Sequence, residues 1–217
     1  MIYFLLSWIQ CECRTARQRP DDEHSWLPAV PAVFIKLSGL YRLMTTRRGF
    51  FIGRFQPVHN GHVQLIEQIA SEVDELVIGI GSAGNSHTVD DPFTAGERTM
   101  MVRTSLESLP VRVYAIPIED LNRNAVWVSH VQSMTPRFDI AYSNNPLVIR
   151  LFTEAGVAVQ STAMYNRDHL RGRKIRQLII DGEDWGQYVP AAVENVIDEV
   201  NGIERLRSVD GGDGVRP

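Results

Sequence analysis

The amino-acid sequence predicts an α/β fold, a doubly wound parallel sheet in three layers with helices on both faces. Three observations predict it. Short apolar runs of strand length recur along the chain, the segments between them carry apolar residues at helical spacing, and the first run ends at a Gly-Arg pair directly before a helix. Uniformly apolar runs are typical of strands buried on both faces, and strands that alternate with helices are typical of a parallel sheet.

The predicted elements follow one another in strict alternation. The first strand is "GFFIG", and apolar residues in the helix after it form one stripe. Strands are expected at residues 49–53, 75–81, 111–118, 138–143 and 157–161. Helices are expected at residues 62–73, 94–109, 124–134, 146–154, 171–181 and 190–201. Ligands of such sheets bind outside the carboxyl ends of the strands, so each strand-to-helix junction is a candidate wall of a site.

One helix start has a clear local signal. Thr94 stands at the expected N-cap, and Glu97 follows three residues later, which is the spacing of a capping box. The side chains at these two positions can each satisfy a backbone N–H of the other, so we expect the helix to begin at this threonine.

The two ends of the chain differ from its middle. Residues 1–43 hold both cysteines and a polar stretch without sustained periodicity, and they predict a poorly ordered N-terminal extension. An alternative is that translation starts at Met44. We expect one folded domain over residues 44–207 and a flexible glycine-rich tail over 208–217.

Composition narrows the class of protein. The 217 residues suffice for one domain with a full core, and 44% of them are hydrophobic, as in ordinary globular proteins. The net charge of −4 argues against a nucleic-acid partner, which usually meets a basic surface. With cysteines only at positions 11 and 13 and no membrane segment or convincing signal peptide, we expect a cytoplasmic protein without a membrane partner.

The first strand-to-helix junction, "GRFQPVHNGH", has the residues of a phosphate cradle. The N-terminus of a helix offers unpaired N–H groups and a partial positive charge. Gly61 permits close approach of backbone to a phosphate, and Arg54 can supply a bidentate fork. His59 and His62, three residues apart, can each donate to a phosphate oxygen and gain a proton as negative charge builds. Neither GxxxxGK[ST] nor GxGxxG occurs at this junction.

Other readings of this junction stay open. Histidines at a helix start can simply cap the helix, and this alternative carries more weight for His59 than for His62. A pair at this spacing can also bind a metal, but the sequence offers no third ligand near it. We therefore assign no metal ligand among the side chains.

The junction "GRFQPVHNGH" resembles the nucleotidylyltransferase superfamily and, within it, the archaeal-type nicotinamide-nucleotide adenylyltransferases, whose HxGH motif it matches. The stretches "GSAGNSHTVDDPFTAGERTMM", "NRNAVWVSHVQSMTPRFDIAYSNNPLVIRLF" and "YNRDHLRGRKIRQLI" resemble further blocks of that family, in the same order. The resemblance spans residues 47–206 and implies the Rossmann-like nucleotidylyltransferase fold.

The resemblance implies transfer of AMP from ATP to nicotinamide mononucleotide (NMN), which gives NAD and pyrophosphate. The phosphate of NMN is itself a nucleophile, so the protein has to align two polyanions and stabilise the leaving pyrophosphate. Histidines, arginines, a helix terminus and Mg²⁺ can do this, with Mg²⁺ held mainly by the phosphates. Small-molecule nucleotides are then the partners, and the resemblance also suggests a homo-oligomer.

The resemblance also places individual residues. The catalytic residues that it implies are His62, His59 and Arg176. The residues that it implies for ATP are Gly53, Arg54, Phe55, His59, Gly61, His62, Tyr142, Asn144, Asn145 and Arg176. The residues that it implies for NMN are Ser82, His87, Thr88, Phe93, Arg98, Asn124 and Trp127.

Several of these roles have a structural alternative. Phe55 can instead be an anchor of the core, and Trp127 can instead be core packing. Arg98 is expected to clamp the phosphate of NMN, with a surface ion pair as the alternative. Ser82 can serve the turn in which it stands.

The last block departs from the family. Where the family has a small hydroxyl residue and usually an acidic one, this chain has Arg173 and Lys174, within the run Arg171-Gly172-Arg173-Lys174. The change adds positive charge near Arg176. Two alternatives to NAD synthesis stay open. One is the same chemistry on a flavin or pantetheine phosphate, and the other, to which the departing run is the only pointer, is a nucleotide-binding regulator that has lost turnover.

Overall fold

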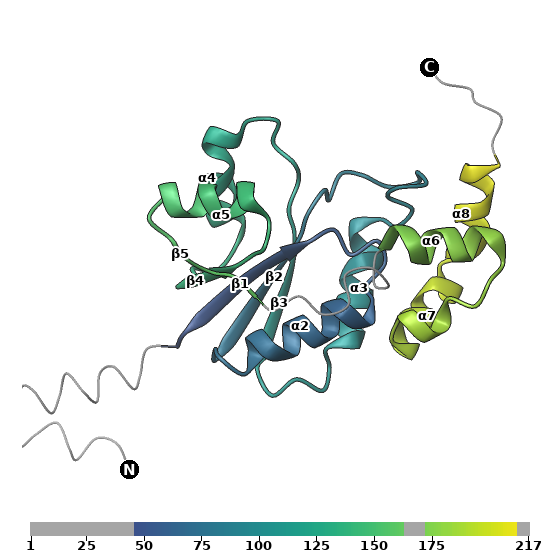
Figure 1. Ribbon diagram of the computed structural model, residues 1–217, viewed down its shortest axis with the longest axis horizontal. Helices are drawn as coiled ribbons and strands as arrows, with labels where there is room; N and C mark the ends of the chain where they lie inside the picture. Colours follow the sequence, from purple (N-terminus) through teal and green to yellow (C-terminus); the bar gives the residue numbers. More distant parts are fainter. Residues whose placement is uncertain (1–45, 163–171, 212–217) are drawn as a thin grey trace, which may run out of the picture. The chain divides into compact units, whose positions relative to one another are not determined.

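The computed structural model describes residues 46–162 and 172–211. Within them, five parallel strands form one sheet in the order β3-β2-β1-β4-β5 (Figure 1). The strands are β1 (Arg48–Gly53), β2 (Glu75–Ile80), β3 (Arg112–Pro117), β4 (Ile140–Tyr142) and β5 (Ala158–Gln160).

Helices follow the strands in the predicted alternation. They are α2 (Asn60–Ala70), α3 (Ala95–Ser105), α4 (Asn124–Met134), α5 (Pro146–Glu154), α6 (Gly172–Asp181), α7 (Ala191–Glu199) and α8 (Gly202–Asp210), with a short 3-10 helix η1 (Gly186–Tyr188). Figure 1 shows α4 and α5 on one side of the sheet and α2 and α3 on the other. The doubly wound, three-layer fold expected from the sequence is therefore confirmed.

Each face of the sheet has its own apolar core because successive residues of a strand point to opposite faces. Phe51 and Ile78 pack with the helices on the side of α2 and α3, together with α6, α7 and α8. Their neighbours Phe50 and Val77 pack on the other side with Phe152 of α5 and with residues of α4. Burial on both faces explains why β1 and β2 carry no polar residue after their first positions, Arg48 and Glu75.

The order of the strands creates a switch point beside β1. The chain winds outward from β1 to β2 and β3, then returns to place β4 on the other side of β1. In parallel sheets of this kind, ligands bind at the carboxyl ends next to the point where the order reverses. Gly53 ends β1 and Ser143 follows β4, so the loops after these residues flank that point.

Two expectations about the C-terminal region need correction. The sequence predicted no helix beyond residue 201, yet α8 runs from Gly202 to Asp210. The predicted tail from residue 208 therefore begins inside a helix, and Val209 packs partly against the core. Asn201, in the left-handed region with φ of 51°, separates α7 from α8.

The expected extension over residues 1–43 lies outside the described residues, as does Arg171 of the departing run. Among the helices of the described part of the chain, none has the length and apolar character needed to cross a bilayer.

Candidate active site

The cradle predicted at the end of β1 is closed by a reciprocal pair of histidine caps. His59 is the N-cap of α2, and its Nδ1 accepts from the backbone N–H of His62 at 3.2 Å. Nδ1 of His62 accepts in turn from the backbone N–H of His59 at 3.3 Å. The two rings stack at 3.6 Å between centroids. His59 thus does cap the helix, and the same contacts also fix the ring of His62.

These caps determine which ring nitrogens can bind a ligand. Because Nδ1 of each imidazole accepts a backbone hydrogen bond, the proton of each neutral ring resides on Nε2. Each histidine therefore retains one N–H donor, at Nε2, and the cap holds that donor in a fixed orientation.

Burial keeps both imidazoles neutral. Removal from water lowers the pKa of His59 to about 4. Burial, followed by repulsion from His59, lowers the pKa of His62 well below its usual value. The pair therefore consists of neutral donors near pH 7, and uptake of a proton requires a bound anion that compensates for the cost of burial.

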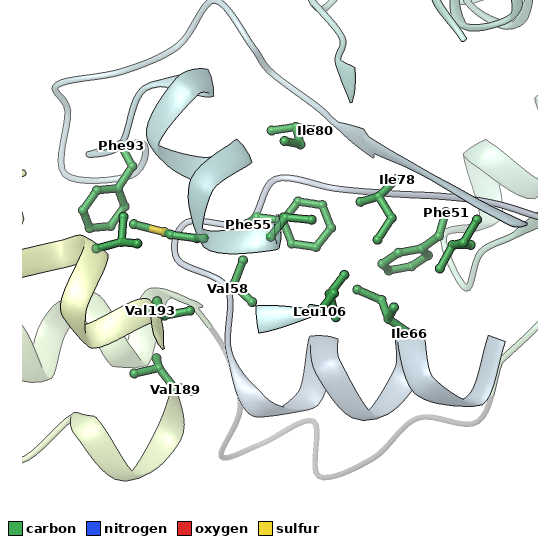
Figure 2. Packing of buried hydrophobic residues seen from close by; sticks show 14 of the residues in the cluster. Phe51, Phe55, Val58, Ile66, Ile78, Ile80, Phe93, Leu106, Val189 and Val193 are labelled. Carbon is green, nitrogen blue, oxygen red and sulfur yellow. The ribbon is translucent and has the colours of Figure 1, made fainter. Parts of the chain in front are cut away.

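The residue that turns the chain from β1 into the cradle is Phe55, with φ of 54°. Its side chain is 1% exposed and its ring lies 4.8 Å from that of His62. Figure 2 shows Phe55 among the buried residues of this layer. The alternative role as a core anchor is correct for the Phe55 side chain, which leaves only its backbone available to a nucleotide.

Arg176 of α6 reaches the cradle from a distant part of the sequence. Its guanidinium is buried, and it donates to the carbonyl oxygen of Gln56 at 2.8 Å and to that of Val89 at 2.8 Å. It also pairs with the carboxylate of Asp90 at 3.1 Å. The structure therefore brings Arg176 beside the turn that carries His59 and His62, as the resemblance implied.

Arg98 does not clamp a substrate phosphate, and the expectation that it does is wrong. Its side chain is fully buried. All five of its N–H groups donate to backbone carbonyls, namely those of Arg54, Gly81, Ser82, Asn85 and Thr94. The alternative of a surface ion pair is wrong as well. Arg98 instead ties the loop after β1 to the loop after β2.

Phe93, expected at the NMN site, is also part of the core. Its side chain is 0% exposed, and its backbone N–H and carbonyl are both bonded to the side-chain amide of Gln56, at 3.0 and 2.8 Å. Figure 2 shows the ring in the buried cluster. No polar backbone group of Phe93 is left for a ligand, so the assignment to NMN is corrected.

The remaining residues of the loop after β2 lie at the expected edge of the sheet. Ser82 and His87 have left-handed backbones, with φ of 50° and 58°. The hydroxyl of Thr88 accepts from the backbone N–H of Asp91 at 3.0 Å, which gives it a role within the loop. His87 is exposed, so its ring is accessible to a ligand.

On the other side of β1, Tyr142 does not face the site. Its side chain is buried against the start of β1, and its hydroxyl donates to Glu72, beyond the C-terminal end of α2, at 3.1 Å. Burial and this hydrogen bond raise the pKa of Tyr142 to about 12. The expected ATP contact of its side chain is therefore wrong, because the ring points away from the carboxyl ends of the strands.

Two asparagines follow Tyr142 at the carboxyl end of β4. The side chain of Asn144 bonds Thr162, which ties the end of β4 to the end of β5. Asn145 is the N-cap of α5 and accepts from the N–H of Leu147. Both asparagines lie at the expected edge, but their side chains already have partners in the loop.

Asn124 and Trp127 lie in the first turn of α4. Asn124 is exposed, whereas Trp127 is half-buried with its ring 5.4 Å from that of Phe152, edge to face. Trp127 thus packs partly against the core, as the alternative held, and part of the side chain remains exposed.

Several contacts at the cradle were not predicted from the sequence. Gln56 is a buried hub, and Gly172 lies so close that an added Cβ would come within 2.8 Å of the Gln56 carbonyl oxygen. Asp90 and Asp91 face the arginines Arg176 and Arg54. A pair of adjacent acidic residues within an arginine-rich site was the available signal.

The basic residues at the start of α6 take different directions. The ammonium of Lys174 lies 5.1 Å from the ring centroid of Tyr188, and Arg173 is exposed. In residues 46–162 and 172–211, no three or more His, Cys, Asp or Glu side chains come together as a metal site. The cradle thus combines a helix N-terminus, two neutral donors and two arginines, which suits a polyphosphate.

Comparison with protein families and curated proteins identifies relatives of this chain. Residues 50–178 match the cytidylyltransferase-like family. The nicotinamide-nucleotide adenylyltransferase of Halorubrum lacusprofundi is 62% identical over 162 residues, which are 75% of this chain and 92% of that protein. The nicotinamide-nucleotide adenylyltransferase of Methanolobus tindarius is 58% identical over 167 residues, or 77% and 96% of the two chains.

A solved structure from Francisella tularensis shares the fold. It is a bifunctional NMN adenylyltransferase/ADP-ribose pyrophosphatase in complex with AMP and a manganese ion. The TM-score is 0.63 at 20% sequence identity, and the match covers 76% of this chain and 52% of that one.

Proposed function

Since the chain belongs to the cytidylyltransferase-like family and, within it, to the nicotinamide-nucleotide adenylyltransferases, we propose how its site moves AMP from ATP to NMN. The enzyme forms NAD and pyrophosphate. The observation that carries the assignment of roles is the reciprocal cap of His59 and His62 beside the buried Arg176.

The triphosphate of ATP binds at the N-terminus of α2. The Nε2–H groups of His59 and His62 donate to its oxygens, and Gly61 and Gly53 border the same turn. Arg54, whose side chain is 58% exposed, reaches the phosphates from the rim, and Arg176 binds them from α6. This arrangement stabilises the charge that collects on pyrophosphate as it leaves.

An oxygen of the NMN phosphate attacks the α-phosphorus of ATP in line with the leaving pyrophosphate. The bond from the α-phosphorus to the bridging oxygen breaks, and no side-chain nucleophile is required. Mg²⁺ would be held mainly by phosphate oxygens of ATP, where it would offset part of their negative charge. The protein contributes alignment and donors, each held by backbone contacts.

The acceptor nucleotide binds across the carboxyl ends of β2 and β4. Ser82, His87 and Thr88 line one side of this region, and Asn124 and the accessible part of Trp127 line the other. Asn144 and Asn145 border the adenosine. Cytoplasmic location and a homo-oligomeric state remain predictions.

One assay tests the function and its alternatives. The protein is incubated with ATP and Mg²⁺ and, in separate reactions, with NMN, nicotinic acid mononucleotide, flavin mononucleotide or phosphopantetheine, and pyrophosphate is measured. We expect release with NMN, matched mole for mole by NAD. Release with only the flavin or pantetheine acceptor, or nucleotide binding without any release, contradicts the proposal.

A further inference from the structure

Arg54 and Arg176, the two arginines assigned to the phosphates, each lie beside the carboxylate of an aspartate. Asp90 and Asp91 are adjacent in the loop between β2 and α3. Nη2 of Arg176 lies 3.1 Å from Oδ1 of Asp90, and Nη1 of Arg54 lies 3.7 Å from Oδ1 of Asp91. Carboxylates thus lie beside the two guanidinium groups that are to bind a triphosphate.

The arginine is the buried member of one pair, and the aspartate is the buried member of the other. In the first pair, the side chain of Arg176 is 5% exposed and that of Asp90 is 76% exposed. In the second pair, Arg54 is 58% exposed and Asp91 is 11% exposed. A buried guanidinium has lost its hydration and requires an acceptor or a counter-charge. A carboxylate already in water loses little when it leaves its partner, so Asp90 is the one that can be exchanged.

Arg176 stays in place when that exchange happens. Its Nε donates to the carbonyl oxygen of Val89 and its Nη1 to that of Gln56, both at 2.8 Å and both independent of the Asp90 carboxylate. These two contacts fix the plane of the guanidinium. When a phosphate replaces the Asp90 carboxylate at Nη2, only the exposed side chain of Asp90 therefore has to move.

We propose that Asp90 is a displaceable counter-ion of Arg176, which leaves when the polyphosphate binds and returns when pyrophosphate departs. The inference rests on the proposed phosphate role of Arg176. It makes Asp90 a positioning residue that weakens the binding of any phosphate anion and favours release of the product. Asp91, which is buried, remains in place throughout.

The test is the affinity for inorganic pyrophosphate, measured by calorimetry in the Asp90→Asn variant of the full chain. Asparagine keeps the size of the side chain and removes the competing charge. We expect Kd to fall about threefold to tenfold, the scale of one exposed ion pair together with one nearby like charge. The fall is expected both with Mg²⁺ and with a chelator, because displacement does not require the metal.

Two variants separate this effect from general electrostatics. Glu154→Gln removes the same charge from another exposed pair, Arg150–Glu154 at 2.7 Å, and is expected to leave Kd unchanged. In an Arg176→Gln background, Asp90→Asn is expected to lose its effect, since the group for which the two anions compete is gone. Structural damage by Asp90→Asn would weaken binding, which is the opposite of the expected change.

Three results overturn the inference: an unchanged Kd, a raised Kd, or the absence of pyrophosphate binding by the wild type. A Kd that is raised only with Mg²⁺ would mean that Asp90 binds the metal in the complex. Because the readout is pyrophosphate binding without turnover, NAD formation by the wild type with an unaltered Kd in the variant refutes only this inference. A wild type without NAD formation refutes the proposed function.

Discussion

Single side chains in this protein serve both the fold and the chemistry, through different atoms of one ring. His59 and His62 use Nδ1 to close the first turn of α2, which leaves Nε2 for a ligand. The cap therefore does more than stabilise a helix, because it sets the tautomer and the direction of both donors.

Replacing His62 with alanine removes one of these donors from the developing charge. We expect kcat for NAD formation to fall by a factor that corresponds to about 2–4 kcal/mol, as for loss of one oxyanion-type donor. Loss of the cap should cost about 1 kcal/mol of stability in addition, which thermal unfolding would report separately. A near-normal kcat in a folded variant would refute the catalytic role of His62.

The pKa of His59 predicts how stability depends on pH. In the folded state the pKa is lowered to about 4 from an ordinary value of 6.5. Below pH 6.5 the unfolded chain binds the proton and the folded chain does not, so the contribution of His59 is complete above 6.5 and declines as the pH falls toward 4. The free energy of unfolding should fall by a total that approaches about 3 kcal/mol over this range.

This contribution can be isolated with His59→Asn, since asparagine also caps helices but does not titrate. The free energy of unfolding of the wild type minus that of the variant should decrease as the pH is lowered from 6.5 to 4. A difference that is constant over this range contradicts the buried, neutral state of His59.

Because Arg98 is buried and bonded to backbone carbonyls, its replacement should lower the stability of the protein. A clamp for the substrate phosphate would instead predict a lower affinity for NMN. Arg98→Met leaves buried carbonyl oxygens without donors, and we expect the free energy of unfolding to fall by at least about 3 kcal/mol. Arg103→Met, at an exposed position of the same helix, should change it by less than about 0.5 kcal/mol. A stable Arg98→Met variant that shows only a higher KM for NMN would support the earlier expectation that Arg98 binds the phosphate of NMN.

At the scale of elements, α8 is attached to the start of α3 by an ion pair with two contacts. Nη1 and Nη2 of Arg205 lie 2.7 and 2.9 Å from the carboxylate of Glu97, which also closes the capping box with Thr94. Burial alone would raise the pKa of Glu97, but the hydrogen bonds from Arg205 and Thr94 outweigh it and the pKa is lowered. The stabilisation by Glu97 is therefore present above its ordinary pKa and is lost as the pH falls through the lowered one.

We expect Arg205→Gln to lower the free energy of unfolding by about 1–3 kcal/mol, because it leaves a largely buried carboxylate without its partner. Arg150→Gln breaks an exposed pair within α5 and should cost less than about 0.5 kcal/mol. Equal losses in chemical denaturation of the two variants would contradict the special role of the α8–α3 contact.

Elements were easier to predict from the sequence than the directions of side chains. Apolar runs located the strands of the sheet, and the Thr94 signal located the start of α3. The assignment of Phe93 and Arg98, in the same stretch, to the NMN site was wrong. The sequence pattern does not reveal which polar or aromatic side chain points into the core. Helix α8 was not predicted because the end of α7 and the start of α8 depend on the left-handed backbone of Asn201, which the sequence pattern does not indicate.

At the scale of the whole molecule, the strand order decides which distant segments meet. Arg176 lies 120 positions after Gln56, yet the two are hydrogen-bonded. Sequence could predict that the junctions meet at one edge of the sheet. It could not predict the contacts of Asp90 or Gly172, since these depend on how α6 packs against the loops.

Both apolar cores and every proposed site residue lie within residues 46–162 and 172–211. We therefore expect a chain that begins at Met44 to form NAD with kcat and KM within about twofold of the full chain, because it keeps both cores and every residue assigned to the site, and changes outside such features usually have small effects. Steady-state kinetics of the two chains would test this. A large loss of activity would assign the first 43 residues a part in the enzyme.

The five carbonyls gathered by Arg98 have one more consequence. The loops after β1 and β2 and the start of α3 lose their conformational entropy when the chain folds, before any nucleotide binds. These segments have little left to order on binding, so we expect any ordering that accompanies binding to fall on other parts of the site.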